Sequence, residues 1–269
     1  MTAPAGTSAV GALLREWRQR RRMSQMDLAL EANVSTRHLS FVETGRARPS
    51  ADLVLHLADE LDVPLRERNS LLLAAGYAPV YSDTPLEAGE MEPVRAALDT
   101  ILAGHEPFPA VVVDRHWDLV TANRTAYRTF IDGIPGHLLG PPANALRLTL
   151  HPEGLAPRIT NLPEYSAHVL ERLHRQATTS GDPALAALLE ELRAYPGVTM
   201  RSPAPGDIAS RLFVPLVLQT GDGRELRFFS TIATFGTALD ITIAELAIES
   251  LFPADDATSA ALADAATDG

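Results

Sequence analysis

Residues 24–48 constrain the fold of this chain more than any other stretch, because they hold the signals for two short helices joined by a tight turn. Ser24 and Asp27 have the spacing of a capping box, so we expect a helix to begin just after Ser24. Ala29 lies four residues before Asn33. A small residue lets two helices approach closely, and Asn tolerates the left-handed backbone of a tight turn. This spacing therefore predicts a helix-turn-helix.

The second helix of the pair and the helices around it have signals of the same kind. Ser35 is a good N-cap for the second helix, and Gly45 is suited to end it. Apolar residues at helical spacing predict one helix before the pair. Ser50 is expected to cap a fourth helix and Pro64 to start a fifth. We predict an all-α, five-helix helix-turn-helix domain at residues 8–77.

Charge is distributed unevenly along the chain. The net charge is −11, which on its own disfavours a nucleic-acid partner. Residues 1–50, however, hold eight arginines against four acidic residues, giving +4, so the remaining residues carry −15. A basic N-terminal region followed by an acidic body is compatible with DNA binding by the first part alone.

An ordered set of residues in the first part carries a family resemblance: Gln25, Leu28, Ala29, Asn33, Val34, Leu39, Val42, Glu43 and Gly45. Roughly residues 10–75 resemble the Cro/phage-repressor-like (XRE) helix-turn-helix domain. One departure is Asn33, which stands where the family often has Gly and is physically acceptable there.

The resemblance implies how this domain docks on a double-stranded DNA operator, with its third helix in the major groove. Residues expected to face base edges are Thr36, Arg37, His38, Ser40 and Phe41; residues expected to contact phosphates are Gln25, Arg46 and Arg48. Arg37 would bind a guanine edge and Phe41 a thymine methyl group, whereas His38 fits either a base or solvent. The family also places an ion pair between Arg18 and Glu43, which ties the first helix to the third.

The rest of the chain predicts a second domain of α+β class. With 269 residues, two domains are expected, and a Pro- and Gly-containing linker at residues 78–90 separates them. Short strands are predicted at 110–114 and 118–123, a helix at 124–131, two long helices at 163–180 and 183–195, and a hairpin of 211–220 with 225–235 around Gly-Asp-Gly.

The second domain is predicted to span residues 91–253. The secondary structure at its C-terminal end is ambiguous from the sequence. Residues 240–252 fit a strand or a helix, and β-branched Ile241, Thr242 and Ile243 favour a strand at the start. Residues 254–269 are small and acidic and are expected to be disordered.

Three stretches of the body, 111–123, 144–155 and 235–255, resemble a PAS-type sensor and, more closely, the ligand-binding domain of MmyB-like transcription regulators, which follows an XRE domain in that family. This resemblance implies a small apolar or amphipathic effector, fatty-acid-like, held between the sheet and the helices.

Candidate ligand-binding residues are polar or aromatic groups beside apolar runs: Asn123, His151, Arg211 and Phe229. The three polar ones also fit structural roles, as a helix cap, a turn residue and a surface cation. Two alternating faces are expected to pack on helices or to line a cavity: Leu212, Val214, Leu216 and Leu218, and Phe229, Thr231 and Ala233.

The sequence contains none of the common motifs for catalysis, metal binding or nucleotide binding. The chain has no cysteine, no H-E-x-x-H, G-x-S-x-G or P-loop, and no GxGxxG, so we predict no catalytic site, metal or cofactor. Glu164, His168 and Glu171 share one helix face but fit a solvated surface better than a metal site. No basic and apolar leader and no long apolar run occurs, so a cytoplasmic protein without membrane segments is expected.

The favoured interpretation is a one-component transcription regulator that binds an operator and a small-molecule effector. A homodimer is expected, because such domains bind half-sites about 34–36 Å apart. One alternative is a DNA-binding antitoxin or adaptor whose acidic body binds a protein; a second is an enzyme fused to a DNA-binding domain.

Overall fold

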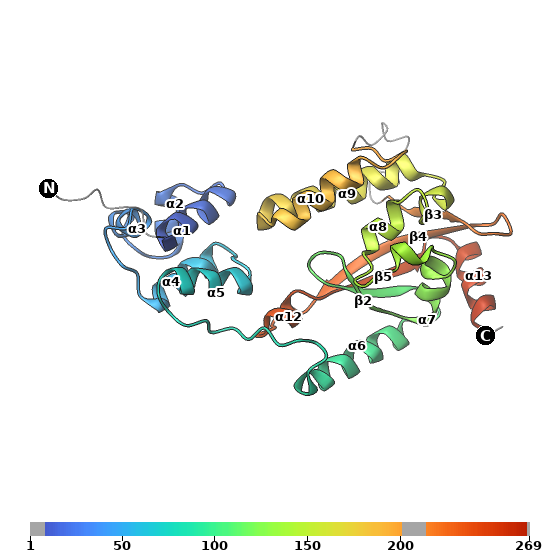
Figure 1. Ribbon diagram of the computed structural model, residues 1–269, viewed down its shortest axis with the longest axis horizontal. Coiled ribbons are helices and arrows are strands. Elements are labelled where there is room, and N and C mark those ends of the chain that lie inside the picture. The colour runs from blue at the N-terminus through green and yellow to red at the C-terminus, as the bar shows by residue number, and fades with distance from the viewer. Residues whose placement is uncertain (1–8, 201–213, 268–269) are drawn as a thin grey trace. The chain divides into compact units, whose positions relative to one another are not determined.

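A computed structural model of the chain describes residues 9–200 and 214–267, which form two compact units (Figure 1). The first unit is Met1–Pro85 with Thr237–Ala244, and the second is Leu86–Gly236 with Glu245–Gly269. These boundaries differ from the predicted 77 and 91 because Asn69 binds the backbone of Val80 and Tyr81, which joins the start of the predicted linker to the first unit.

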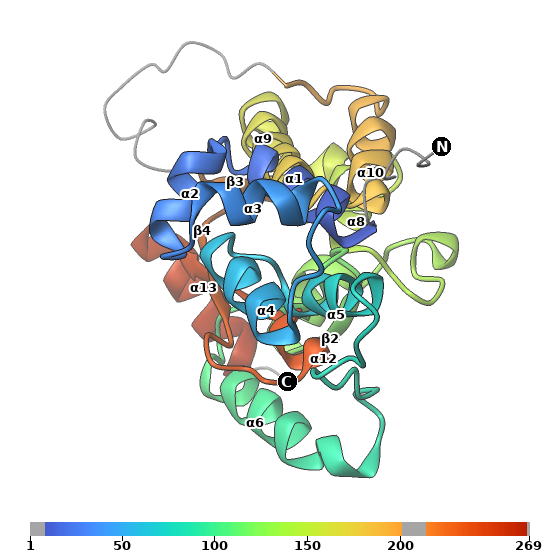
Figure 2. The same cartoon turned by 90° about the vertical axis from the view of Figure 1, so that its left-hand side faces the viewer.

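Residues 9–74 of the first unit form five helices, as predicted (Figure 2). They are α1 (Ala9–Arg20), α2 (Gln25–Glu31), α3 (Thr36–Glu43), α4 (Ala51–Glu60) and α5 (Leu65–Ala74). Serines cap three of them as expected: Ser24 closes the capping box with Asp27, while Ser35 and Ser50 accept bonds from the first turns of α3 and α4. Asn33 has φ 51°, which confirms the left-handed turn.

The core of the first unit is continuous through all five helices, and Leu14, Leu28, Leu39, Leu57 and Leu72 are fully buried in it. Burial of this apolar surface supplies most of the driving force for folding.

The second unit contains one antiparallel sheet of five strands in the order β2-β1-β5-β4-β3. The strands are β1 (Ala110–Val113), β2 (Leu119–Ala122), β3 (Leu216–Gln219), β4 (Glu225–Thr234) and β5 (Ala247–Pro253). Helices cover both of its faces, so the predicted α+β class is confirmed.

Among the residues that the structure describes, the helices of this unit are α6 (Glu92–Gly104), α7 (Arg124–Ala126) continuing into the π-helical turn η2 (Tyr127–Ile131), α8 (Ala145–Leu150), α9 (Leu162–Ser180), α10 (Pro183–Arg193) and α13 (Asp256–Thr267). Its described part also contains three short 3₁₀ turns: η1 (Gly89–Met91), η3 (Gly136–Leu138) and η4 (Ala156–Arg158). In the described ranges, no helix is long and apolar enough to cross a membrane.

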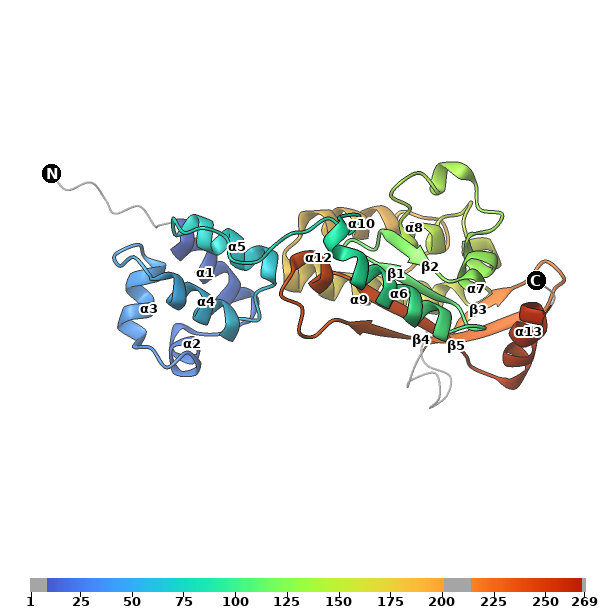
Figure 3. The ribbon, with the colours of Figure 1, turned by 90° about the horizontal axis from the view of Figure 1, so that it is seen from below.

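Alternation along β1 assigns the two faces of the sheet. Ala110 and Val112 pack with α6, which lies in front of the sheet in Figure 3. Val113 packs with α8, α9 and α10 on the opposite face. The antiparallel register places Ile248 of β5 opposite Val112 and Glu249 opposite Val111, so Glu249 faces the α8–α9 side.

Three sequence predictions for this region were wrong. Ile241–Ala244 is a helical turn, α12, because Asp240 caps it through the amide of Thr242; the strand begins only at Ala247. Residues 256–267 form α13 where disorder was expected, since Leu262 is buried against the sheet.

The third wrong prediction concerns β4. Its core face is formed by Leu226 and Phe228, whereas Thr231 and Ala233 are exposed. Of the strand predicted at 211–220, the part before Val214, including Leu212, lies outside the described residues.

Candidate functional site

The first turns of α3 form an exposed polar surface on the first unit. Leu39 and Val42 anchor the helix in the core. Thr36, Arg37 and His38 are exposed, and the side chain of Ser35 caps the helix through the amide of His38. A rigid helix with its N-terminal side chains in solvent has the form that is needed to read a groove.

Phe41 organises two arginines on this surface. The guanidinium carbons of Arg37 and Arg46 lie 5.3 and 5.9 Å from the centroid of its half-buried ring. Cation–π contact therefore holds both cations on the same side of α3. Ser40 lies in the same helix and is half-buried. The five predicted base-contacting residues thus lie together on one helix.

Two of the predicted phosphate-contacting residues have internal partners. Gln25 donates from Nε2 to Oε2 of Glu43 at 2.7 Å. Arg48 donates to the carbonyl oxygen of Ala75 at 3.1 Å and lies 5.4 Å from the ring centroid of Tyr77. Both side chains therefore stabilise the unit itself, and their phosphate contacts stay a prediction.

The ion pair implied by the family resemblance is present. Arg18 binds both carboxylate oxygens of Glu43, with Nε–Oε1 at 2.7 Å and Nη2–Oε2 at 2.9 Å, and both residues are buried. The hydrogen bond with Glu43 raises the pKa of Arg18. Because the pair joins α1 to α3, it fixes the position of the exposed helix surface.

A second candidate site is an apolar crevice between the sheet and helices α8 and α9 of the second unit. It comprises two adjoining cavities of about 60 and 130 Å³, and both are lined by Tyr165, Leu216 and Leu251. The π-helical turn η2 contributes Phe130 and Ile131 to the smaller cavity. Such turns often occur at functional sites because they displace side chains from regular helical positions.

Polar groups project into this apolar space. Glu249 lines the smaller cavity and Arg172 the larger, and their closest atoms are 3.4 Å apart. Arg172 also lies over the Trp117 ring, at 4.4 Å from its centroid, but its Nε is buried and has no hydrogen-bond partner among the described residues. Burial raises the pKa of Tyr165, which keeps its phenol neutral. Burial, together with Arg172, lowers the pKa of His168.

The predicted ligand-binding residues are not brought together. Asn123 caps α7 and bonds to the backbone of Ala110 and Phe108, so its buried side chain is occupied by structural bonds. It lies in the wall of a different, surface groove of about 510 Å³. His151 accepts a bond from the amide of Glu153 and lies away from the crevice. Only Phe229 lines the crevice, and Arg211 lies outside the described residues.

The crevice residues that sequence reasoning missed are Tyr165, Arg172 and Glu249. One signal was available: Glu249 is an acidic residue inside the apolar run of β5, at a position where a strand buries its side chain. Tyr165 and Arg172 have no comparable local signal, since polar residues are ordinary on a long helix.

One group of acidic and imidazole side chains lies close enough to hold a cation within the described part of the chain: Asp114, His116 and Asp118. Asp114 accepts bonds from the amides of His116 and Asp118, and His116 lies 2.9 Å from Asp182. These bonds order the β1–β2 turn. The helix face of Glu164, His168 and Glu171 gives no such group.

Two family models match the chain in tandem. Residues 9–71 match a helix-turn-helix domain, and residues 94–265 match the MmyB-like transcription regulator ligand binding domain. The second match covers more than half of the chain and includes α13. No curated protein matches the chain.

Three solved structures illustrate what this chain is similar to. The clp gene regulator ClgR from C. glutamicum is 29% identical, over 26% of this chain and 86% of its own, with a TM-score of 0.23. The restriction-modification controller protein C.AhdI from Aeromonas hydrophila is 33% identical, over 23% and 92%, with a TM-score of 0.22. An RNA-binding light-oxygen-voltage receptor is 13% identical, over 96% and 62%, with a TM-score of 0.25.

These TM-scores are low, so the two family matches alone identify the chain. They assign a DNA-binding function to the first unit and a ligand-binding function to the second. The chain belongs to the MmyB-like transcription regulators, with a helix-turn-helix DNA-binding domain ahead of the family's ligand-binding domain.

Proposed function

We propose that this regulator reads its operator with the exposed surface of α3, and that an amphipathic acid bound in the crevice changes its operator affinity. For DNA reading, the supporting observation is that Phe41 holds Arg37 and Arg46 on the exposed side of α3. The remaining base contacts proposed are Thr36, His38, Ser40 and Phe41, and the remaining phosphate contacts are Gln25 and Arg48.

Arg37 and Arg46 can be distinguished by their effect on sequence preference. Arg37→Ala should cost about 1–3 kcal/mol on a selected operator and relax the preference at one base pair, because Arg37 would bind a guanine edge. Arg46→Ala should weaken binding on all duplexes and lower the salt slope by about one, because it would contact a phosphate. Fluorescence anisotropy on matched and mutated duplexes measures both. An equal loss of affinity on all duplexes would show that Arg37 contacts a phosphate and not a base.

For the effector, the supporting observation is the buried Arg172 Nε, which has no partner in the described structure although it lies beside an apolar cavity. A buried donor without a partner is costly, and a carboxylate oxygen would satisfy it. The apolar walls suit an alkyl chain. Fatty-acid-like compounds combine these two features.

The cavities are smaller than the volume such a ligand needs, since typical ligand pockets hold about 300–1,000 Å³. Binding must therefore move α8 or α9 away from the sheet. Native mass spectrometry of the purified protein, followed by titration with myristate, tests this proposal. Arg172→Met should abolish binding, whereas Arg175→Met on the exposed face of the same helix should not. A co-purified second polypeptide would favour the adaptor alternative instead.

We also propose that the regulator acts as a homodimer. Analytical ultracentrifugation with and without operator tests this assembly. A single copy bound per operator would refute it, because one such small domain is expected to bind weakly.

A further inference from the structure

The first unit contains a segment that lies, in chain order, between two strands of the sheet in the second unit. Residues Thr237–Ala244 connect β4 to β5 but pack with the helices of the first unit. Within them, α12 contacts α5. The connection between two sensor strands is thus a structural part of the DNA-binding unit.

Asp240 fastens this segment to the chain that follows α5. Its Oδ2 accepts a hydrogen bond from Thr84 Oγ1 at 2.7 Å, and its Oδ1 caps α12 through the Thr242 amide at 2.9 Å. The Ile241 amide donates to the carbonyl oxygen of Ser82 at 2.8 Å. Side-chain and backbone bonds therefore hold the two segments together.

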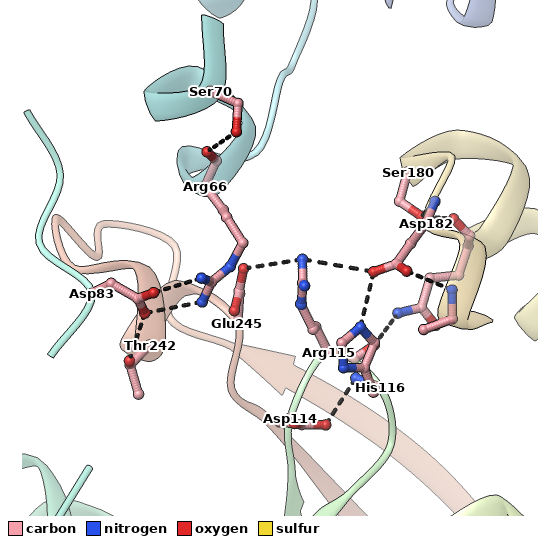
Figure 4. Close-up of polar contacts among 12 residues, drawn as sticks. Arg66, Ser70, Asp83, Asp114, Arg115, His116, Ser180, Asp182, Thr242 and Glu245 are labelled. Atoms are coloured by element: carbon pink, nitrogen blue, oxygen red, sulfur yellow. Dashed lines mark hydrogen bonds and ion pairs between the residues drawn. The ribbon is translucent and has the colours of Figure 1, made fainter. Parts of the chain in front are cut away.

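Asp83 extends these bonds to α5 itself. It forms two hydrogen bonds with the guanidinium of Arg66, one of them at 2.9 Å, and Thr242 Oγ1 lies 3.4 Å from its carboxylate (Figure 4). We call Arg66, Asp83, Thr84, Asp240 and Thr242 the clasp. Because Arg66 and Asp83 are partly exposed, their pair contributes little alone, and the clasp acts as a network.

Two stretches of chain run from the clasp into the second unit, one after α12 and one after Pro85, and each is held there by side-chain contacts. After α12, Glu245 lies 3.7 Å from Arg115, which is also 3.6 Å from Asp182 (Figure 4). After Pro85, the carbonyl oxygens of Leu86 and Ala88 accept bonds from Arg95 of α6. Only a short stretch of chain joins the clasp to each of these anchors, so the connection between the units is the covalent chain itself.

The strands that flank α12 also line the crevice. Phe229 and Ser230 lie on β4, and Glu249 and Leu251 lie on β5. Binding in the crevice must separate its helices from the sheet, and a resulting shift of β4 or β5 reaches α12 through the chain itself. We propose that the clasp transmits effector occupancy to α5, which packs on α1 and α4, and thereby sets operator affinity. This inference rests on the proposed function.

Operator DNA can probe the same coupling in reverse, because coupling between two sites is reciprocal. An operator duplex is first selected from random sequence with the wild-type protein. Hydrogen–deuterium exchange of the full-length protein is then measured with and without it. We expect the operator to change amide exchange in β5 by about fivefold or more.

The variant Asp83→Ala/Thr84→Val removes the clasp bonds of these two side chains and leaves the α12 cap in place. It should bind the operator but lose the change in β5. Asp59→Asn is the matched control, because it breaks the Arg68–Asp59 pair between α5 and α4, outside the clasp, and it should behave as wild type. Exchange in α1–α4 without DNA reports whether each variant is folded.

The clasp inference is overturned if the double variant retains the operator-induced change in β5, or if wild type shows none. Failure to select any duplex overturns the proposed DNA reading itself. That failure would be seen with wild type, before any variant is compared.

Discussion

Removal of the Glu43 carboxylate should destabilise the first unit more than any exposed substitution. Glu43 accepts three hydrogen bonds, two from Arg18 and one from Gln25, and its side chain is only 1% exposed. In Glu43→Gln the shape is kept but the charge is lost. The guanidinium of Arg18, 9% exposed, then remains buried without a counter-charge, and its bond to the Met23 carbonyl oxygen is the other contact that holds it.

The expected magnitude follows from this burial. Breaking a buried ion pair on one side costs about 3–5 kcal/mol, because the remaining charge is desolvated and uncompensated. Domains of this size are stable by about 5–15 kcal/mol, so this loss is a large share of the total. The contact between α1 and α3 should therefore open far more often than in the wild type. The double replacement Arg18→Met/Glu43→Leu removes both charges and should recover most of the loss.

Hydrogen exchange of the α3 amides is the suitable assay, because it reports the first unit separately from the second. Glu16→Gln is the control: it breaks the exposed Arg20–Glu16 pair on α1 and should cost less than about 0.5 kcal/mol. If Glu43→Gln behaved like Glu16→Gln, or if the double replacement were worse than the single one, the buried-charge explanation would be refuted.

Three further predictions concern packing and pH. Gly11→Ala should destabilise the first unit by about 1–3 kcal/mol in denaturant titration, because its Cβ would lie 2.4 Å from a main-chain oxygen of α3. Leu262→Ala should cost about 2–5 kcal/mol and expose α13 to proteolysis, whereas the same change at exposed Leu239 should do neither. Burial and the bond to Glu191 raise the pKa of Tyr195 to about 12. Its contribution to stability is therefore present below pH about 10 and lost as pH rises through about 12, so urea titrations of Tyr195→Phe should show a shallower decline across that window.

Most of the first unit could be predicted because its signals are local. A cap is decided by residues within one turn, so Ser24, Ser35 and Ser50 were sufficient to place three helix starts. The turn at Asn33 depends on that residue's own backbone preference. The internal partners of Gln25 and Arg48 were not predictable in the same way, since Glu43 and Ala75 are distant in sequence.

The crevice of the second unit depends on which residues tertiary structure brings together. Asn123 and His151 stood beside apolar runs, but their side chains are used for a helix cap and a turn. Arg172 and Glu249 are 77 residues apart and meet only because α9 lies over β5. A short sequence window contains no information about such a pair, so the polar part of the site was missed.

The error at residues 241–243 has a different cause, which bears on how the two units are coupled. The β-branched run favours a strand, and in isolation that preference is sound. Asp240 outweighs it by capping a helical turn and binding Thr84, and Ile241 is buried within the first unit. Local preference and tertiary structure therefore disagree at α12, and such disagreement is expected where function constrains the chain. A helical turn that depends on the Asp240 bonds and on tertiary packing, against its own local preference, is a suitable element for a switch.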